Sequence, residues 1–119
     1  MIERVRLADK LASFDELWRP KIVGQVNEFA VKVVKVRGEF VWHHHEEEDE
    51  LFLVLNGRLT VRTRDGDVGL EAGDLVVVPA GVEHCPVAQE ETSVLLLERE
   101  TTVNTGTAGG ERTASAEWI

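Results

Sequence analysis

An all-β fold, built as an antiparallel sandwich or barrel with a short N-terminal helical segment, is what this 119-residue sequence predicts. Apolar and polar residues alternate over many short segments, and this period of two is typical of half-buried strands. Turn signals such as Asp65-Gly66 and Pro79-Ala80-Gly81 separate the segments at short intervals. Short strands joined by regular turns, with almost no helical period, are typical of sandwiches and barrels.

The one helical segment lies near the N-terminus. Leu7, Leu11 and Phe14 are spaced at i, i+4 and i+7, which places them on one helical face. Pro20 ends any helix by Arg19. We expect one or two helical turns that pack onto the rest of the domain.

Strand patterns follow from Lys21 onward. Branched residues alternate with charged ones up to Arg37, and Gly38 separates this segment from the next expected strand, Phe40 to His45. Leu75 to Val78 is apolar on both faces, which indicates the inside of a sandwich or an interface. The other expected strands cover residues 50–55, 59–64, 68–70 and 93–98.

Composition and charge exclude several classes of partner. The chain has 13 basic and 22 acidic residues and a net charge of −9, so it lacks the clustered cations that nucleic acids and anionic membranes require. No apolar run is long enough to span a membrane, and no signal peptide is evident. The single cysteine, Cys85, cannot form an internal disulfide. We therefore expect a cytoplasmic protein.

The polar stretch from Trp42 to Glu50 contains three histidines and five acidic residues. In a strand, residues two apart share a face and lie roughly 7 Å apart, so His43 and His45 project together while His44 projects oppositely. If the next strand is a neighbour, Glu50 converges on them, and two imidazoles with a carboxylate suit a divalent first-row metal ion. The alternative is a solvated loop without chemistry, which is our interpretation of residues 46–49.

His84 is a candidate fourth ligand. It follows the turn Pro79-Ala80-Gly81 and is expected at the start of a strand, at the rim of a barrel. A lone histidine is more often structural than a ligand, so this position alone does not establish a metal site.

The two histidine-containing segments together resemble the two motifs of the cupin superfamily. The first runs Gly38, four residues, His43-x-His45, four residues, Glu50, six residues, Gly57. The second runs Gly73, five residues, Pro79-x-Gly81, two residues, His84. Two features depart from the family pattern. Gly38 and His43 are separated by one residue fewer than in that pattern, and Ala88 stands where the pattern has Asn. Neither departure affects a position that is a metal ligand in the family.

The resemblance covers about residues 29–98. It implies a double-stranded β-helix, the cupin or jelly-roll barrel, in which His43, His45, Glu50 and His84 bind one divalent transition metal: zinc, iron, nickel, manganese or copper. We expect residues 1–119 to form a single domain, with a core barrel at 29–98, an N-terminal helix and strand at 5–28 and a C-terminal arm at 101–119. The whole chain also resembles the small single-domain cupins called mannose-6-phosphate isomerase-like, a subgroup without an assigned reaction.

Three functions remain open from the sequence. The first is a metal-dependent isomerase, epimerase or dioxygenase that acts on a small polar or anionic molecule. The second is a non-catalytic module that binds a small ligand or a metal, and the third is a structural cupin whose site stays empty. No separate general base is identifiable, because the carboxylates other than Glu50 are expected to be exposed. The apolar outer faces of the strands, such as the one carrying Leu51, Leu53 and Leu55, predict a homodimer.

Overall fold

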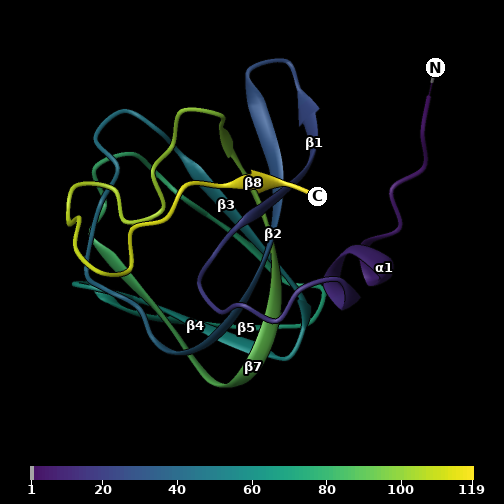
Figure 1. Cartoon of the computed structure of the whole chain (residues 1–119). Coiled ribbons are helices and arrows are strands. Elements are labelled where there is room, and N and C mark those ends of the chain that lie inside the picture. Colours follow the sequence, from purple (N-terminus) through teal and green to yellow (C-terminus); the bar gives the residue numbers. More distant parts are fainter. Residues whose placement is uncertain (1) are drawn as a thin grey trace.

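The computed structural model describes residues 2–119 and consists mainly of one folded sheet (Figure 1). One helix, α1 (Leu7–Ala12), precedes the strands. The strands are β1 (Lys21–Val26), β2 (Phe29–Glu39), β3 (Glu50–Asn56), β4 (Arg58–Thr63), β5 (Gly66–Glu71), β6 (Leu75–Val78), β7 (His84–Arg99) and β8 (Glu117–Trp118). The predicted all-β class with a short N-terminal helix is confirmed.

The long strands β2 and β7 hold the barrel together. They pair antiparallel from Phe29↔Arg99 to Glu39↔Val87, with an irregularity between Val36 and Gly38. The first part of β7 also pairs with β4, and its later part pairs with β3. Because one long strand serves two sets of neighbours, the sheet folds over on itself and encloses an interior.

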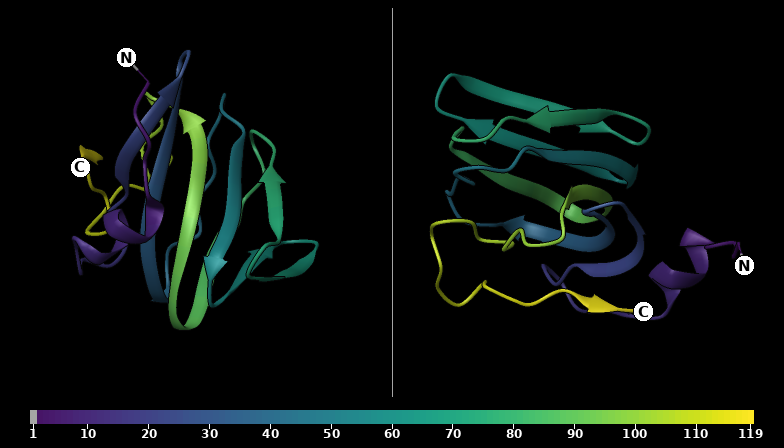
Figure 2. Two further views of the ribbon diagram at one scale, coloured as in Figure 1. Left: turned by 90° about the vertical axis from the view of Figure 1, so that its right-hand side faces the viewer. Right: turned by 90° about the horizontal axis from the view of Figure 1, so that it is seen from above.

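Side-chain alternation along these strands separates an inner face from an outer one. Inner residues form a continuous buried core that includes Val34, Val54, Leu59, Val61 and Leu96. Outer residues of β1 and β2 form a second cluster with Phe14, and Leu7 and Leu11 of α1 pack against it. Figure 2 shows α1 on the β1–β2 side of the molecule, away from the β4–β5 hairpin. Leu7 and Leu11 therefore share the predicted apolar helical face, whereas Phe14 lies beyond the end of α1 and joins the same cluster from outside the helix.

Two local predictions were wrong. Phe40 to His45 is not a strand, because β2 runs through Gly38 to Glu39 and His43 makes only an isolated bridge, to His84. The β4–β5 register pairs Thr63 with Gly66, so the turn is centred one residue earlier than Asp65-Gly66. Gly66 still has a positive φ of 135°, which explains why glycine follows this turn.

The C-terminal arm is packed against the barrel. Thr102 and Thr105 are buried, and β8 pairs in parallel with β1 through Lys21↔Glu117 and Ile22↔Trp118. Among the described residues, no helix is long and apolar enough to cross a membrane.

Candidate metal centre

Four side chains from two separate parts of the sequence meet inside the barrel. His43, His45, Glu50 and His84 each present one nitrogen or oxygen atom, and these atoms all lie within 4.8 Å of one another. All four residues are at most 4% exposed. The structure therefore brings together every residue that the sequence indicated as a metal ligand.

Backbone hydrogen bonds fix two of the histidines opposite each other. The His43 amide donates to the His84 carbonyl at 3.0 Å, and the His84 amide donates to the His43 carbonyl at 2.9 Å. This antiparallel bridge brings the two imidazole rings to a centroid distance of 4.3 Å. His84 begins β7, so the bridge attaches the irregular 40–45 segment to the barrel wall.

Further contacts hold the rest of the histidine segment. The Gly81 amide donates to the His45 carbonyl at 2.7 Å, and the Thr107 amide of the C-terminal arm donates to the His44 carbonyl at 3.1 Å. Gly106 lies so close to the His44 carbonyl that a Cβ atom would collide with it. The glycine thus allows the arm to pack against the segment that carries the site.

Two histidines have a defined tautomer. The Nδ1 atoms of His43 and His84 lie 2.8 and 2.9 Å from the carbonyl oxygens of Val41 and Val82. A carbonyl only accepts hydrogen bonds, so each Nδ1 must donate its proton. The Nε2 lone pair of each neutral ring then remains available to a ligand, which is the usual arrangement of a metal-binding histidine.

Several polar atoms of the cluster are buried without a hydrogen-bond partner. They are His45 Nε2, His84 Nε2 and Glu50 Oε1. The carboxylate oxygen lies 3.4 Å from each of the two nitrogens. Buried polar groups normally have partners, and a mixed nitrogen and oxygen donor set is typical of sites for first-row divalent ions. The cluster is thus able to bind a metal ion.

Electrostatics favour the protonation states that metal binding needs. Burial lowers the pKa of His43 from 6.5 to about 4, even though its hydrogen bond to the Val41 carbonyl raises it. Burial alone raises the pKa of Glu50, but the neighbouring side chains of Glu98, His45 and His84 outweigh this, and the net shift is downward. At neutral pH the site therefore contains a neutral His43 imidazole and a Glu50 carboxylate.

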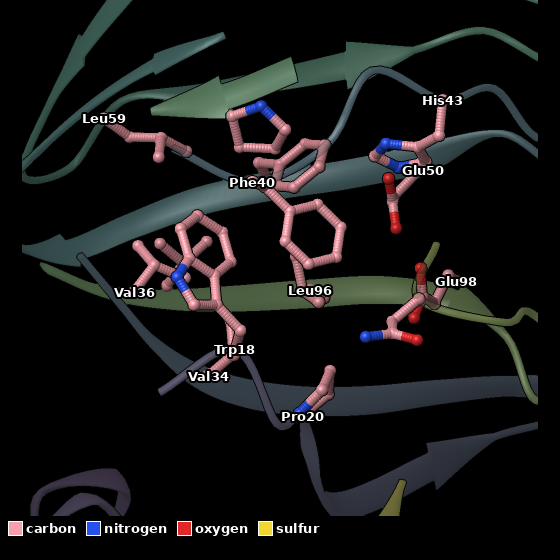
Figure 3. Close-up of a pocket in the computed structure, with 14 residues that line it drawn as sticks. Trp18, Pro20, Val34, Val36, Phe40, His43, Glu50, Leu59, Leu96 and Glu98 are labelled. Carbon is pink, nitrogen blue, oxygen red and sulfur yellow. The ribbon is translucent and has the colours of Figure 1, made fainter. Parts of the chain in front are cut away.

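A mostly apolar cavity opens beside the cluster (Figure 3). Its volume is about 40 Å³, which is room for about three water molecules. Trp18 and Phe40 stack at a centroid distance of 4.7 Å and form part of its wall. The polar residues that line it are His43, Glu50, Glu98 and Asn104.

Glu98 corrects the expectation that all other carboxylates are exposed. It is only 1% exposed and lines the cavity, and Figure 3 shows its carboxyl group facing that of Glu50. Its Oε1 accepts a hydrogen bond from Lys32 Nζ at 2.8 Å. Burial raises the pKa of Glu98 well above its ordinary value, and the neighbouring Glu50 raises it further.

A sequence signal for Glu98 existed. Val94, Leu96 and Glu98 alternate on one face of β7, and Lys32, Val34 and Val36 alternate on one face of β2. A lysine and a glutamate each continue an apolar inner face, so the two charges must be buried together. Asn104 was also missed, because nothing in the sequence indicates that the arm reaches the cavity.

The residues near the cluster that we expected to lie outside it do so. Glu46, Glu47 and Asp49 are exposed, and His44 projects away from the cluster toward Thr107. Trp42 does not line the cavity, and the Arg64 guanidinium lies 3.7 Å from its ring centroid. Burial raises the pKa of Cys85, which is fully buried and not among the clustered residues.

Comparisons with known proteins agree with this architecture. Residues 30–98 match the cupin domain family. The chain is 34% identical over 79 residues to the uncharacterised protein YdbB of Bacillus subtilis, covering 66% of this chain and 70% of that protein. The crystal structure of a cupin-2 domain protein from Shewanella frigidimarina superposes with a TM-score of 0.79 at 41% identity, covering 80% of this chain and 93% of that one.

A more distant structure shares the fold alone. Hydroquinone 1,2-dioxygenase from a Sphingomonas species, solved with 4-hydroxybenzoate bound, has a TM-score of 0.70 at 15% identity and covers 92% of this chain and 75% of its own. The family match extends over more than half of the chain and contains all four clustered residues, His43, His45, Glu50 and His84. This protein therefore belongs to the cupin family.

Proposed function

We propose that His43, His45, Glu50 and His84 bind one divalent transition metal, which in turn binds a small oxygen-bearing molecule. The metal would be zinc, iron, nickel, manganese or copper, because this donor set accepts all of them. The observation that carries the proposal is the set of buried, unpartnered donor atoms, His45 Nε2, His84 Nε2 and Glu50 Oε1, beside a cavity.

Four protein ligands leave one or two positions of such an ion open to water or substrate. A bound metal would supply Lewis acidity or, as iron, dioxygen chemistry. The protein would supply the apolar wall that limits water and the Glu98 carboxyl group beside Glu50. These features support an enzyme of the isomerase, epimerase or dioxygenase type.

The ligand is expected to be small and to carry little negative charge beyond the group that binds the metal. None of the described residues that line the cavity is Lys or Arg. A phosphorylated sugar would therefore find no cation for its phosphate there, although such groups usually bind to Arg, Lys or helix N-termini. The resemblance to mannose-6-phosphate isomerase-like cupins stays a prediction about kinship.

The alternative function is a non-catalytic module that binds a small ligand or a metal. A cavity with only apolar residues beyond the four ligands would favour it. The cavity instead includes Glu98 and Asn104, two polar side chains that can contact a ligand. This favours the enzyme.

Metal binding can be tested with a matched pair of histidine variants. His43→Ala removes one clustered imidazole, whereas His44→Ala removes the neighbouring imidazole that points away. Titration with Co²⁺, followed by its visible absorption, should give about one equivalent for wild type and His44→Ala and at least tenfold weaker binding for His43→Ala. Unchanged binding by His43→Ala contradicts the proposal.

Catalysis can be separated from simple binding by two assays on protein loaded with each of the five metals. An isomerase or epimerase should exchange the protons next to the carbonyl of dihydroxyacetone for deuterium in D₂O, measured by NMR. A dioxygenase loaded with Fe²⁺ should consume oxygen with a small enediol such as ascorbate faster than free Fe²⁺ does. Ligand-dependent spectral changes without either reaction favour the binding module.

The outer sheet face supports a homodimer. Cross-strand pairs align Val77 with Leu51 and Leu75 with Leu53, and the rows continue to Leu97 and Leu95 of β7. Leu75 is 57% and Val77 49% exposed, so the β6 end of this apolar face is uncovered. Sedimentation at micromolar concentration should give a dimer for wild type and a monomer for Leu75→Asp. A wild-type monomer would refute the homodimer.

The cytoplasmic location of the protein stays a prediction.

A further inference from the structure

The Lys32–Glu98 pair is an unusual feature of the barrel interior. Lys32 is 2% and Glu98 1% exposed, and Lys32 Nζ donates to Glu98 Oε1 at 2.8 Å. Isolated charges are almost never buried this deeply, because removing them from water is costly unless each is paired. The lysine thus holds one oxygen of Glu98 in a fixed position.

The second oxygen of Glu98 is available. Glu98 Oε2 is buried and has no hydrogen-bond partner within the protein. Glu98 lines the same cavity as Glu50 and His43. β3 and β7 pair up to Leu51↔Leu97, and continuing this register by one position sets Glu50 opposite Glu98. A molecule bound at the four-residue cluster would therefore lie beside this oxygen.

We propose that Glu98 is a ligand-binding residue, whose free oxygen accepts a hydrogen bond from a hydroxyl group of the molecule bound at the cluster. The inference rests on the proposed function, because it needs a metal that binds the same molecule. It narrows the ligand to a small hydroxy compound, such as a 2-hydroxy carboxylate, whose hydroxyl hydrogen points at Glu98. An unpaired buried acceptor rejects an analogue that lacks the donor, because the acceptor then loses water without gaining a partner.

Charge and size agree with this class. With a divalent ion bound, Lys32, Glu98 and Glu50 leave at least one net positive charge in the site, which suits a monocarboxylate. The cavity has room for about three water molecules, so it accepts a ligand of only a few heavy atoms. Asn104 also lines the cavity and can contact the carboxylate end of such a molecule.

The test compares two probes that differ in one donor. Glycolate and methoxyacetate carry the same carboxylate and an equivalent second oxygen, but only glycolate has a hydroxyl hydrogen. Both are titrated into the Co²⁺-loaded protein and followed by the visible absorption of the metal. Acetate serves as a smaller probe without a hydroxyl group. Wild type is expected to bind glycolate at least tenfold more tightly than either of the other two.

Variants assign this preference to Glu98. Glu98→Gln keeps an acceptor oxygen and should retain part of the preference, whereas the Lys32→Met/Glu98→Leu double variant should lose it while keeping its Co²⁺ affinity within about threefold. The double variant avoids an unpaired buried lysine, which could prevent folding of Glu98→Leu alone. Glu91→Gln, on an exposed position of the same strand, is the matched control and should behave as wild type.

Each outcome decides a different claim. Equal wild-type affinities for glycolate and methoxyacetate, or a glycolate preference that survives in the double variant, overturn the role of Glu98 and leave the metal site standing. Metal uptake without a spectral response to any probe overturns the inference and the small-ligand part of the proposed function. Failure of wild type to bind Co²⁺ overturns both.

Discussion

Removing Glu98 alone should destabilise the protein far more than removing Lys32 and Glu98 together. In the Glu98→Leu variant, the ammonium group of Lys32 stays buried at 2% exposure without its partner. Breaking a buried ion pair from one side typically costs about 3–5 kcal/mol, because the remaining charge is left uncompensated. Domains of this size are stable by about 5–15 kcal/mol, so the variant loses a large part of its stability.

The double variant Lys32→Met/Glu98→Leu replaces both charges with apolar groups of similar volume. Such replacements are often neutral or stabilising by about 1–4 kcal/mol, because two desolvation costs disappear with the pair. We expect its free energy of unfolding to lie within about 1 kcal/mol of wild type or above it. The coupling between the two positions would then be at least about 2 kcal/mol, in the range that contacting residues show.

Urea unfolding of the metal-free protein, in the presence of a chelator at pH 7, measures these free energies. Tryptophan fluorescence, to which the buried Trp18 stacked on Phe40 contributes, reports the loss of the interior. Glu71→Gln is the control: its Arg58–Glu71 pair spans 3.5 Å with side chains 83% and 71% exposed, so the change should be below about 1 kcal/mol. A cost below about 1 kcal/mol for Glu98→Leu would refute the reasoning.

Two further predictions concern the site and the barrel. Burial lowers the pKa of His43 to about 4, so between pH 6.5 and 4 the unfolded chain binds more protons than the folded chain does. The free energy of unfolding of the metal-free protein should therefore fall by up to about 3 kcal/mol as the pH drops through this window. Urea unfolding at several pH values should show a shallower dependence for His43→Gln, and identical slopes would speak against the shift. Gly57→Ala should cost about 1–3 kcal/mol more than Gly38→Ala, since both positions have positive φ but only a Cβ at Gly57 would meet Thr92, at 2.5 Å from its Oγ1. Thermal unfolding measures the difference, and equal costs would contradict the steric argument.

Much of the barrel could be predicted from side-chain alternation. The segments that became β3, β4, β6 and the later part of β7 each have a period of two or a continuous apolar run, and local pattern determines them. Phe40 to His45 begins with three apolar residues and was expected to be a strand, but it is not one, because strand formation there depends on whether a neighbouring strand is available. The assignment of residues 1–119 to one domain, with a core at 29–98, stays a prediction.

The four clustered residues of the site could be predicted from the sequence, but Glu98 could not. His43, His45 and Glu50 lie within one short stretch. His84 became a firm candidate only through its place in the second motif, because its bridge to His43 depends on the folded chain. Glu98 was missed because a lone acidic residue at the end of an apolar strand is usually solvated. Its burial depends on Lys32, 66 residues earlier in the chain.

The most direct test of the metal site is the metal content of the protein purified without a polyhistidine tag, measured by mass spectrometry of its elements. About one equivalent of a divalent transition metal per chain is expected, and Glu50→Ala should lose most of it because the buried Oε1 would be absent. Less than about a tenth of an equivalent in wild type, with no uptake when metal is added back, would contradict the account and favour a structural cupin.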